Sequence, residues 1–424
     1  MTVPWRVRCA EATLDLDGLA ARLVNQPAGG PLTPAGALEV QALVIDGGER
    51  VPRRLVLVMA DVVWFADDSA RRLRREVARI AGCEEACVAL AASHTHGTPQ
   101  TDRRFGYGEF DQAFVRRLED QVLATVAAAL ARPAKAVSIT HGASRIDPPV
   151  AVNRRRMAWH LSGRRLTRRV QNLPNRAAPC DNRATVLAFA GADGGPVGVV
   201  VHFACHPVCD PPGSLGPDYP GAMRAALRAR LPDGAFVGFL QGFCGDVRPD
   251  LAHTPRGLKD HLVEAAIGQR FRPSRTGDAE SLGRALADAA ARALATAAAV
   301  DGRKLVAATE TMPLYCASGR ALDRGLDVTV WRVGALAFAF ASGEMLSGLT
   351  SSRPRVLSVG YANGMAGYVA PASAYAAGGY EIDGFLARFG LPERLAPDNA
   401  DRFAALRDRL LAADEVRSPA RAAS

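Results

Sequence analysis

Two kinds of hydrophobic pattern alternate along this chain, and together they predict an α/β protein. Short apolar runs bounded by turn residues predict strands at 38–45, 54–61, 87–93, 136–140, 185–190, 197–204 and 235–241. Apolar positions at helical spacing predict helices at 67–81, 110–131, 219–231, 279–300 and 400–413. Two further apolar runs predict a hairpin around Gly334, at 328–333 and 336–341. Strands separated by helices favour one α/β catalytic domain over two.

No internal repeat or shift of composition marks a domain boundary. Residues 252–276 are polar and predict a loop or a small insertion. We therefore expect one hydrolase domain over residues 1–395, followed at 396–424 by a C-terminal helix and a flexible tail.

Composition narrows the class of protein. The 424 residues are 48% hydrophobic and 22% charged, which is typical of a globular protein. The longest apolar runs, 197–204 and 333–341, are much shorter than the ~18 residues of a membrane-spanning helix, so we expect no membrane partner. The first residues lack the apolar stretch of a secretion signal and the eight cysteines are sparse, so we expect a cytoplasmic protein with reduced thiols.

The formal net charge of +9 comes almost entirely from arginine, because only three of the 52 basic residues are lysine. Acidic residues balance most of the arginines, so we expect no nucleic-acid partner. One dense basic run lies between Arg154 and Arg169. This run is suited to an anionic group on a substrate or a partner.

Four of the eight histidines form two close pairs at the ends of apolar runs. His94 and His96 are two residues apart, so on an extended strand end their side chains share a face. His202 and His206 lie at the end of a second run. Ligands gather at strand ends in α/β proteins, and neutral imidazole suits zinc. The pairs therefore predict a metal site, with histidines that only cap or pack as the alternative.

Cys205 and Cys209 offer a second interpretation of the same segment, a compact structural zinc knot with His202 and His206. Structural zinc sites of this kind usually have a second cysteine pair nearby, and none is present. Small buried residues are the commoner role for such cysteines.

Short segments in a fixed order carry a family resemblance. They are Ser93-His-Thr-His-Gly-Thr-Pro, Asn153-Arg-Arg, Phe203-Ala-Cys-His-Pro with Pro217-Asp-Tyr-Pro-Gly, Gln241-Gly-Phe-Cys-Gly-Asp-Val-Arg-Pro, Ser342-Gly-Glu-Met and residues 363–381. In sequence and in order along the chain, these segments resemble segments of the neutral, non-lysosomal ceramidases, over roughly residues 5 to 385. The resemblance implies mixed β-sheets flanked by helices and a zinc-dependent amidase, which in that family cleaves the N-acyl bond of ceramide.

The resemblance also implies roles for particular residues. The zinc ligands it implies are His94, His206, Glu344 and Tyr368. The catalytic residues it implies are His96 for proton transfer, Arg154 to polarise the substrate, Tyr380 near the reacting carbonyl, and Tyr368 itself. In this assignment His202 does not bind the metal but lies next to a residue that does. Two imidazoles, a carboxylate and a phenol leave room on Zn²⁺ for a water, whose pKa the ion lowers towards ~7.

The chain also departs from the ceramidase pattern. Gly242 and Phe243 stand where the family has a serine and an asparagine, so no hydroxyl nucleophile remains there. Cys244 matches a family position that is not catalytic. The loop at 100–109 is charged, whereas a lipid-binding mouth is apolar, so we expect a substrate other than ceramide.

These observations lead to one hypothesis and one alternative. The hypothesis is a zinc-dependent hydrolase that cleaves an amide, ester or lactam bond of a small polar molecule with an anionic group. The alternative is zinc-dependent cyclisation or acyl transfer in a biosynthetic pathway, with a substrate nucleophile in place of water. Three acids, Asp61, Asp218 and Asp246, either orient a histidine or cap a turn. The sequence leaves the substrate and the oligomeric state open.

Overall fold

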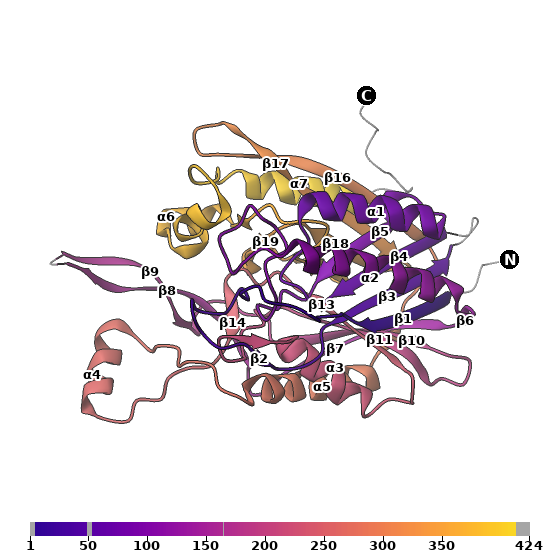
Figure 1. Cartoon of the computed structure of the whole chain (residues 1–424), viewed down its shortest axis with the longest axis horizontal. Helices are drawn as coiled ribbons and strands as arrows, with labels where there is room; N and C mark the ends of the chain where they lie inside the picture. Colours follow the sequence, from indigo (N-terminus) through magenta and orange to yellow (C-terminus); the bar gives the residue numbers. More distant parts are fainter. Residues whose placement is uncertain (1–4, 49–52, 164, 413–424) are drawn as a thin grey trace.

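Two five-stranded sheets packed face to face form the centre of the computed structural model, which describes residues 5–48, 53–163 and 165–412 (Figure 1). The first sheet contains, in spatial order, β5 (Val88–Ala92), β4 (Arg53–Ala60), β3 (Glu39–Gly47), β1 (Arg6–Thr13) and β6 (Lys135–Ala136). The second contains β13 (Phe236–Gln241), β11 (Pro196–Phe203), β10 (Arg183–Ala190), β7 (Ser138–Arg145) and β15 (Ala298–Ala299).

Helices cover the outer faces of both sheets, which gives four layers (Figure 1). The helices on the first sheet are α1 (Asp67–Ala81) and α2 (Gln112–Ala131), and those on the second are α3 (Asp218–Arg228) and α5 (Asp278–Ala295). Sheets covered on both faces need strands that are apolar throughout, which explains the unbroken apolar runs in the sequence. On β3, for example, Leu43 and Ile45 belong to the core between the sheets, while Val44 belongs to the core under the helices.

A third sheet closes the core between the first two. Its strands are β16 (Leu305–Tyr315), β17 (Ala321–Val333), β18 (Leu336–Ala341) and β20 (Val356–Val359). Trp331 and Phe338 extend from it into the same core as Leu43. The predicted hairpin around Gly334 is confirmed as β17 and β18. The C-terminal helix α7 (Asn399–Leu411) packs against β16 and β17, and the predicted tail from residue 413 lies outside the described residues.

A long hairpin projects from the body of the protein (Figure 1). Its strands are β8 (Ala151–Ser162) and β9 (Arg165–Asn175), and β14 (Val247–Pro249) pairs with the base of β8. The basic run predicted near an anionic group is divided by this hairpin. Arg154 is buried at the base, whereas Arg165, Arg168 and Arg169 are exposed towards the tip.

Some predicted elements differ from the structure. The strand predicted at 136–140 is divided between β6 of the first sheet and β7 of the second. The polar segment 252–276 contains a helix, α4 (Leu258–Ile267), which projects beside the hairpin (Figure 1). The helix predicted at 279–300 ends at Ala295, because the chain turns to add β15 to the edge of the second sheet. The remaining elements are the pairs β2 (Thr33–Pro34) with β12 (Ser214–Leu215) and β19 (Glu344–Met345) with β21 (Tyr368–Val369), and helix α6 (Ala372–Ala377). Among the described residues, no helix is both long and apolar enough to cross a membrane.

Candidate metal centre

Three parallel strand pairs, one in each large sheet, deliver their carboxyl ends to one place. The pairs are β4 with β5, β11 with β13, and β18 with β20. His94 follows β5, His206 follows β11 and Glu344 follows β18, each within three residues of the strand end. The carboxyl ends of strands are where α/β proteins place ligands. The three side chains are 1%, 2% and 3% exposed, so the site lies at the centre of the molecule.

His94 is held in place by both its backbone and its ring. Its φ of 65° lies in the left-handed region, which non-glycine residues seldom occupy. The backbone N–H donates to the carbonyl of Val62 at 3.0 Å, and ring atom Nδ1 lies 2.9 Å from the carbonyl of Val63. Because Nδ1 carries the proton for this bond, the lone pair of Nε2 points to the centre of the site.

His206 is oriented in the same way from the second sheet. Its Nδ1 lies 2.8 Å from the carbonyl of Cys244 and 2.9 Å from that of Val247, which leaves Nε2 free. Nε2 is 3.4 Å from Oε2 of Glu344, and Nε2 of His94 is 3.5 Å from the same oxygen. Two imidazole nitrogens and one carboxylate oxygen, all from buried side chains, therefore face one another.

The protonation states suit metal ligands. Burial lowers the pKa of His206 to about 4, so its ring is neutral at neutral pH. Burial alone would raise the pKa of Glu344, but His94 and His206 outweigh it and hold that pKa well below its ordinary value. A neutral imidazole and an ionised carboxylate are the forms that bind a metal ion.

His96 completes a group of three histidines. Its Nε2 lies 3.4 Å from Nε2 of His94, and ligand atoms of His94, His96 and His206 all fall within 4.8 Å of one another. Burial, and then His94 and His206, hold the pKa of His96 well below its ordinary value. Among the described residues this is the one histidine, cysteine and carboxylate group compact enough to hold a metal ion. Geometry alone therefore allows His96 as a ligand, beside the set that the ceramidase resemblance implies.

Arg154 lies against this group from the base of the hairpin. Its Nε donates to Glu381 at 2.8 Å, and its Nη2 donates to the carbonyl of Gly245 at 2.7 Å and to the hydroxyl of Tyr368 at 3.2 Å. Burial opposes the charge, but Tyr368 and Glu381 raise the pKa of Arg154 well above its ordinary value. Arg154 is therefore a fixed cation, and its Nη1 makes no hydrogen bond to a described residue.

A cavity of about 200 Å³ opens onto these side chains. Its lining includes the predicted residues His96, Arg154, His206, Glu344, Tyr368 and Tyr380, together with Val24, Trp64, Tyr107, Asn172 and Arg388. Tyr380 begins a single π-helical turn, Tyr380–Gly384, and its hydroxyl is hydrogen-bonded to that of Tyr107. Such turns are frequent at functional sites. The predicted residues thus lie together in one place.

Tyr361 belongs to the site and was missed by the sequence analysis. Its ring stacks on that of His94, with centroids 3.8 Å apart, and its hydroxyl is 3.5 Å from Oε2 of Glu344. Like His94 it has a positive φ, of 54°. It follows β20, the parallel partner of β18, and this topology is the only signal that would have found it.

His202 points away from the metal centre. The strand β11 ends at Phe203, so the chain turns before His206 and the two histidines do not share a face. Nε2 of His202 lies 2.9 Å from the carbonyl of Ser358 instead. The zinc knot is likewise absent, because Cys205 and Cys209 are buried, unpaired thiols outside any compact ligand group of the described residues.

The three strand-end acids cap turns or form ion pairs rather than orienting histidines. Asp61 pairs with Arg224, with Oδ1 3.0 Å from Nη1. Asp218 accepts the backbone N–H groups of Cys209 and Asp210 at 2.8 and 2.9 Å. Asp246 accepts from Asn153 and Ser347, each at 2.7 Å. The histidine rings use backbone carbonyls for this purpose.

Gly242, which stands where ceramidases have serine, faces away from the metal centre. A Cβ on Gly242 would lie 2.7 Å from the Cβ of Ala204 and 3.0 Å from Nε2 of His202. Phe243 is buried against Phe403 of α7. Cys244 is also buried, and burial raises the pKa of its thiol well above the ordinary value, so it is no nucleophile at neutral pH.

The charged loop predicted at the mouth of the site has most of its charges paired. Arg104 bonds Asp102 at 2.5 Å and Asp67 at 2.9 Å, and Glu109 lies 3.5 Å from Arg22. The loop contributes an aromatic ring, Tyr107, to the cavity. The polarity of the cavity therefore comes from other residues.

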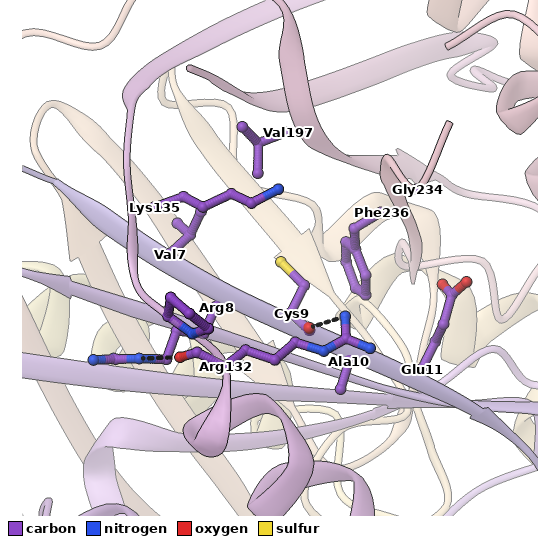
Figure 2. A pocket seen from close by; sticks show the side chains of 11 residues that line it. Val7, Arg8, Cys9, Ala10, Glu11, Arg132, Lys135, Val197, Gly234 and Phe236 are labelled. Carbon is purple, nitrogen blue, oxygen red and sulfur yellow. Dashed lines mark hydrogen bonds between the residues drawn. The ribbon is translucent and has the colours of Figure 1, made fainter. Parts of the chain in front are cut away.

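A larger cavity, of about 360 Å³, lies at the opposite end of β13, lined by Phe236 and Gly234 and by β1 (Figure 2). Its one thiol is Cys9, whose pKa burial raises to about 12. Arg132 there donates to the carbonyl of Cys9 at 2.8 Å. With a protonated thiol and no histidine among its described residues, this cavity has neither a reactive thiolate nor a group of metal ligands.

Comparison with known proteins places the fold. No protein-family model and no curated protein sequence matches this chain. The neutral ceramidase from Pseudomonas aeruginosa matches in structure with a TM-score of 0.73 and 17% sequence identity, over 99% of this chain and 77% of that one. A ceramidase complexed with C2 matches with the same TM-score of 0.73 and 17% identity, over 100% of this chain and 77% of that one. The predicted mixed α/β, ceramidase-like fold is confirmed, and a fold by itself does not name a substrate.

The site predicts which histidines retain a metal ion. His94→Ala or His206→Ala removes a ligand whose ring is already oriented, so elemental analysis of the purified variants should show most of the metal lost. His202→Ala is the matched control, because its ring binds a carbonyl outside the group, and it should keep its metal. Full metal content in both ligand variants, or equal loss in the control, would contradict the site.

The packing around Gly242 predicts the effect of a serine at this position. Gly242→Ser should destabilise the protein by about 1–3 kcal/mol without raising turnover, because Ala204 and His202 leave no room for the added atoms. The melting temperature measures this. Gly257→Ser is the control, because no atom lies within 4 Å of its new Cβ. An unchanged melting temperature with faster turnover in Gly242→Ser would show that the hydroxyl reaches the site.

Proposed function

We propose that this protein is a zinc-dependent hydrolase that cleaves an amide bond of a small polar molecule. The observation that carries the proposal is the placement of His94, His206 and Glu344 around one point, beside the buried cation Arg154. The ceramidase-like fold supports the choice of an amide. Zinc fits the donor set, since it favours two histidines and a carboxylate with a position left open.

The proposed ligands are His94, His206, Glu344 and Tyr368. Tyr368 pairs with Glu344 in backbone register between β21 and β19, which brings both residues to the same cavity. Arg154 donates to the phenol oxygen, but burial and then Glu344 hold the pKa of Tyr368 well above its ordinary value, so the phenol would ionise only with the positive charge of a bound metal ion. When bound, zinc supplies a Lewis acid and lowers the pKa of a water towards ~7.

Three other residues of the cavity then bind the substrate or transfer protons. Arg154 holds the carbonyl oxygen of the substrate through its free Nη1, and Tyr380 donates a second hydrogen bond. His96 accepts a proton from the attacking water and returns it to the leaving nitrogen. The hydroxyl of the water stays on the carbonyl carbon as the C–N bond breaks, so the products are a carboxylic acid and an amine.

The size of the cavity supports a small substrate. Its volume of about 200 Å³ is below the roughly 300–1,000 Å³ typical of ligand pockets. Polar and apolar surface contribute about equally to its lining, and Val24 and Trp64 are among its apolar residues. A long acyl chain would not fit in a cavity of this volume, which argues against ceramide as the substrate.

Acyl transfer is the second candidate, and one observation favours it. An open groove of about 600 Å³ adjoins the cavity and shares Asn172 and Tyr380 with it. A second substrate in this groove could deliver an amine or hydroxyl in place of water.

Product mass tests the proposal directly. Zinc-loaded protein incubated with a panel of short N-acyl amides should yield an acid and an amine whose summed mass exceeds the substrate by one water. Incorporation of ¹⁸O from labelled water into the acid is the matching readout. Products of acyl transfer without ¹⁸O would favour the second candidate, and turnover of long-chain ceramide equal to that of the best short amide would refute the small-substrate proposal.

Arg154 should be needed for turnover and not for metal binding. Arg154→Lys cannot bond Glu381, Gly245 and the substrate together, because lysine lacks the planar fork, so we expect about a 10²-fold loss of kcat with full metal content. Arg155→Lys is the matched control, because Arg155 also bonds Glu381, at 2.5 Å, but does not line the cavity. Wild-type kcat in Arg154→Lys would remove Arg154 from the mechanism.

A further inference from the structure

The sequence predicted that the basic run at Arg154 meets an anionic group, and the structure shows which partners these arginines already have. Arg154 and Arg155 share Glu381, and each also bonds backbone carbonyls. Arg165, Arg168 and Arg169 lie on the projecting hairpin, and none of them lines the cavity. Arg154, the arginine of the run that lines the cavity, therefore already has a carboxylate partner, and only its Nη1 remains for the substrate.

Arg388 is the arginine of the cavity without a charged partner. It lines the cavity from a short helical turn at Ala387–Phe389. Its guanidinium stacks over the ring of Tyr107, 5.0 Å from the centroid. No described residue forms an ion pair or a side-chain hydrogen bond with it. Five N–H donors thus remain for a ligand.

The position of Arg388 is fixed although its side chain is exposed. The next residue, Phe389, is fully buried against Trp64 and Tyr107. The carbonyl of Arg388 accepts the N–H of Gly106 at 2.7 Å, which ties the turn to the loop that carries Tyr107. The fixed turn and the stacking on Tyr107 therefore position the guanidinium at the mouth of the cavity.

The charge balance of the site favours an anion at this place. Glu344 faces the histidines and Glu381 faces Arg154 and Arg155, so neither carboxylate neutralises Arg388. A bound zinc ion would add further positive charge. A concave site of one sign concentrates ligands of the opposite sign.

We propose that Arg388 binds a carboxylate of the substrate, so the substrate class is a small N-acyl compound that carries a carboxylate as well as the scissile amide. Arginine forms two parallel hydrogen bonds with a carboxylate, which fixes orientation as well as affinity. Asn172, which also lines the cavity and has no side-chain hydrogen bond to a described residue, supplies a further donor. This inference rests on the proposed metal-dependent function and names its substrate.

Binding of simple hydroxamates tests the assignment without any need for turnover. Hydroxamates bind zinc, so the monohydroxamates of succinate and glutarate place a carboxylate at two distances from the metal, and butyrohydroxamate is the neutral comparison. Calorimetry on zinc-loaded wild-type protein should show at least about tenfold tighter binding of one carboxylate probe than of the neutral probe. Arg388→Gln should lose that preference and keep the affinity for butyrohydroxamate, and Arg388→Lys should retain part of it.

A matched control separates charge recognition from packing. Arg402 also stacks on a tyrosine, 4.5 Å from the ring centroid of Tyr315, but does not line the cavity. Arg402→Gln should therefore keep the wild-type preference. Equal affinity of all three probes for wild-type protein, or a preference that survives in Arg388→Gln, would overturn the assignment and leave the metal site standing. Failure of every probe to bind zinc-loaded wild-type protein would overturn the metal site, and this assignment with it.

Discussion

The structure depends on one contact at its centre. One carboxylate oxygen of Glu344 lies against the ring nitrogens of both His94 and His206. Each residue comes from a different sheet, so the three sheets must pack in one relative arrangement for the contact to exist. Burial makes the requirement stricter, because an ionised carboxylate at the centre of a protein needs partners of opposite charge or a metal ion. A metal bound at this point would fasten the three sheets together.

Because the three sheets converge at the site, some of the backbone around it adopts strained conformations. His94 and Tyr361 both have positive φ, and their rings stack on one another directly against Glu344. Conformations of this kind persist where the surrounding structure over-determines them, and they gather at functional sites. Carbonyls of Val63, Cys244 and Val247 then set the ring orientations. The local geometry is thus prepared by the fold before any ligand binds.

Hydrophobic periodicity predicted most of the central strands and the helices that cover them, because both faces of the main sheets are buried and leave unbroken apolar runs. It missed β1 and β16. It failed for β8, whose base carries Arg154 and Arg155, because buried arginines paired with Glu381 look polar in a sequence. The histidines could be found from their strand-end positions, and the ceramidase resemblance added Glu344 and Tyr368. Tyr361 and Arg388 could not be found, because each reaches the site only through the pairing of distant segments.

Anomalous diffraction from crystals of zinc-loaded protein would show directly whether the histidines and Glu344 form a metal centre. The account predicts one zinc peak about 2.0–2.2 Å from Nε2 of His94, Nε2 of His206 and a carboxylate oxygen of Glu344. The same map shows whether His96 or Tyr368 is the fourth ligand. Zinc bound elsewhere, with Glu344 still in direct contact with both histidines, would contradict the account.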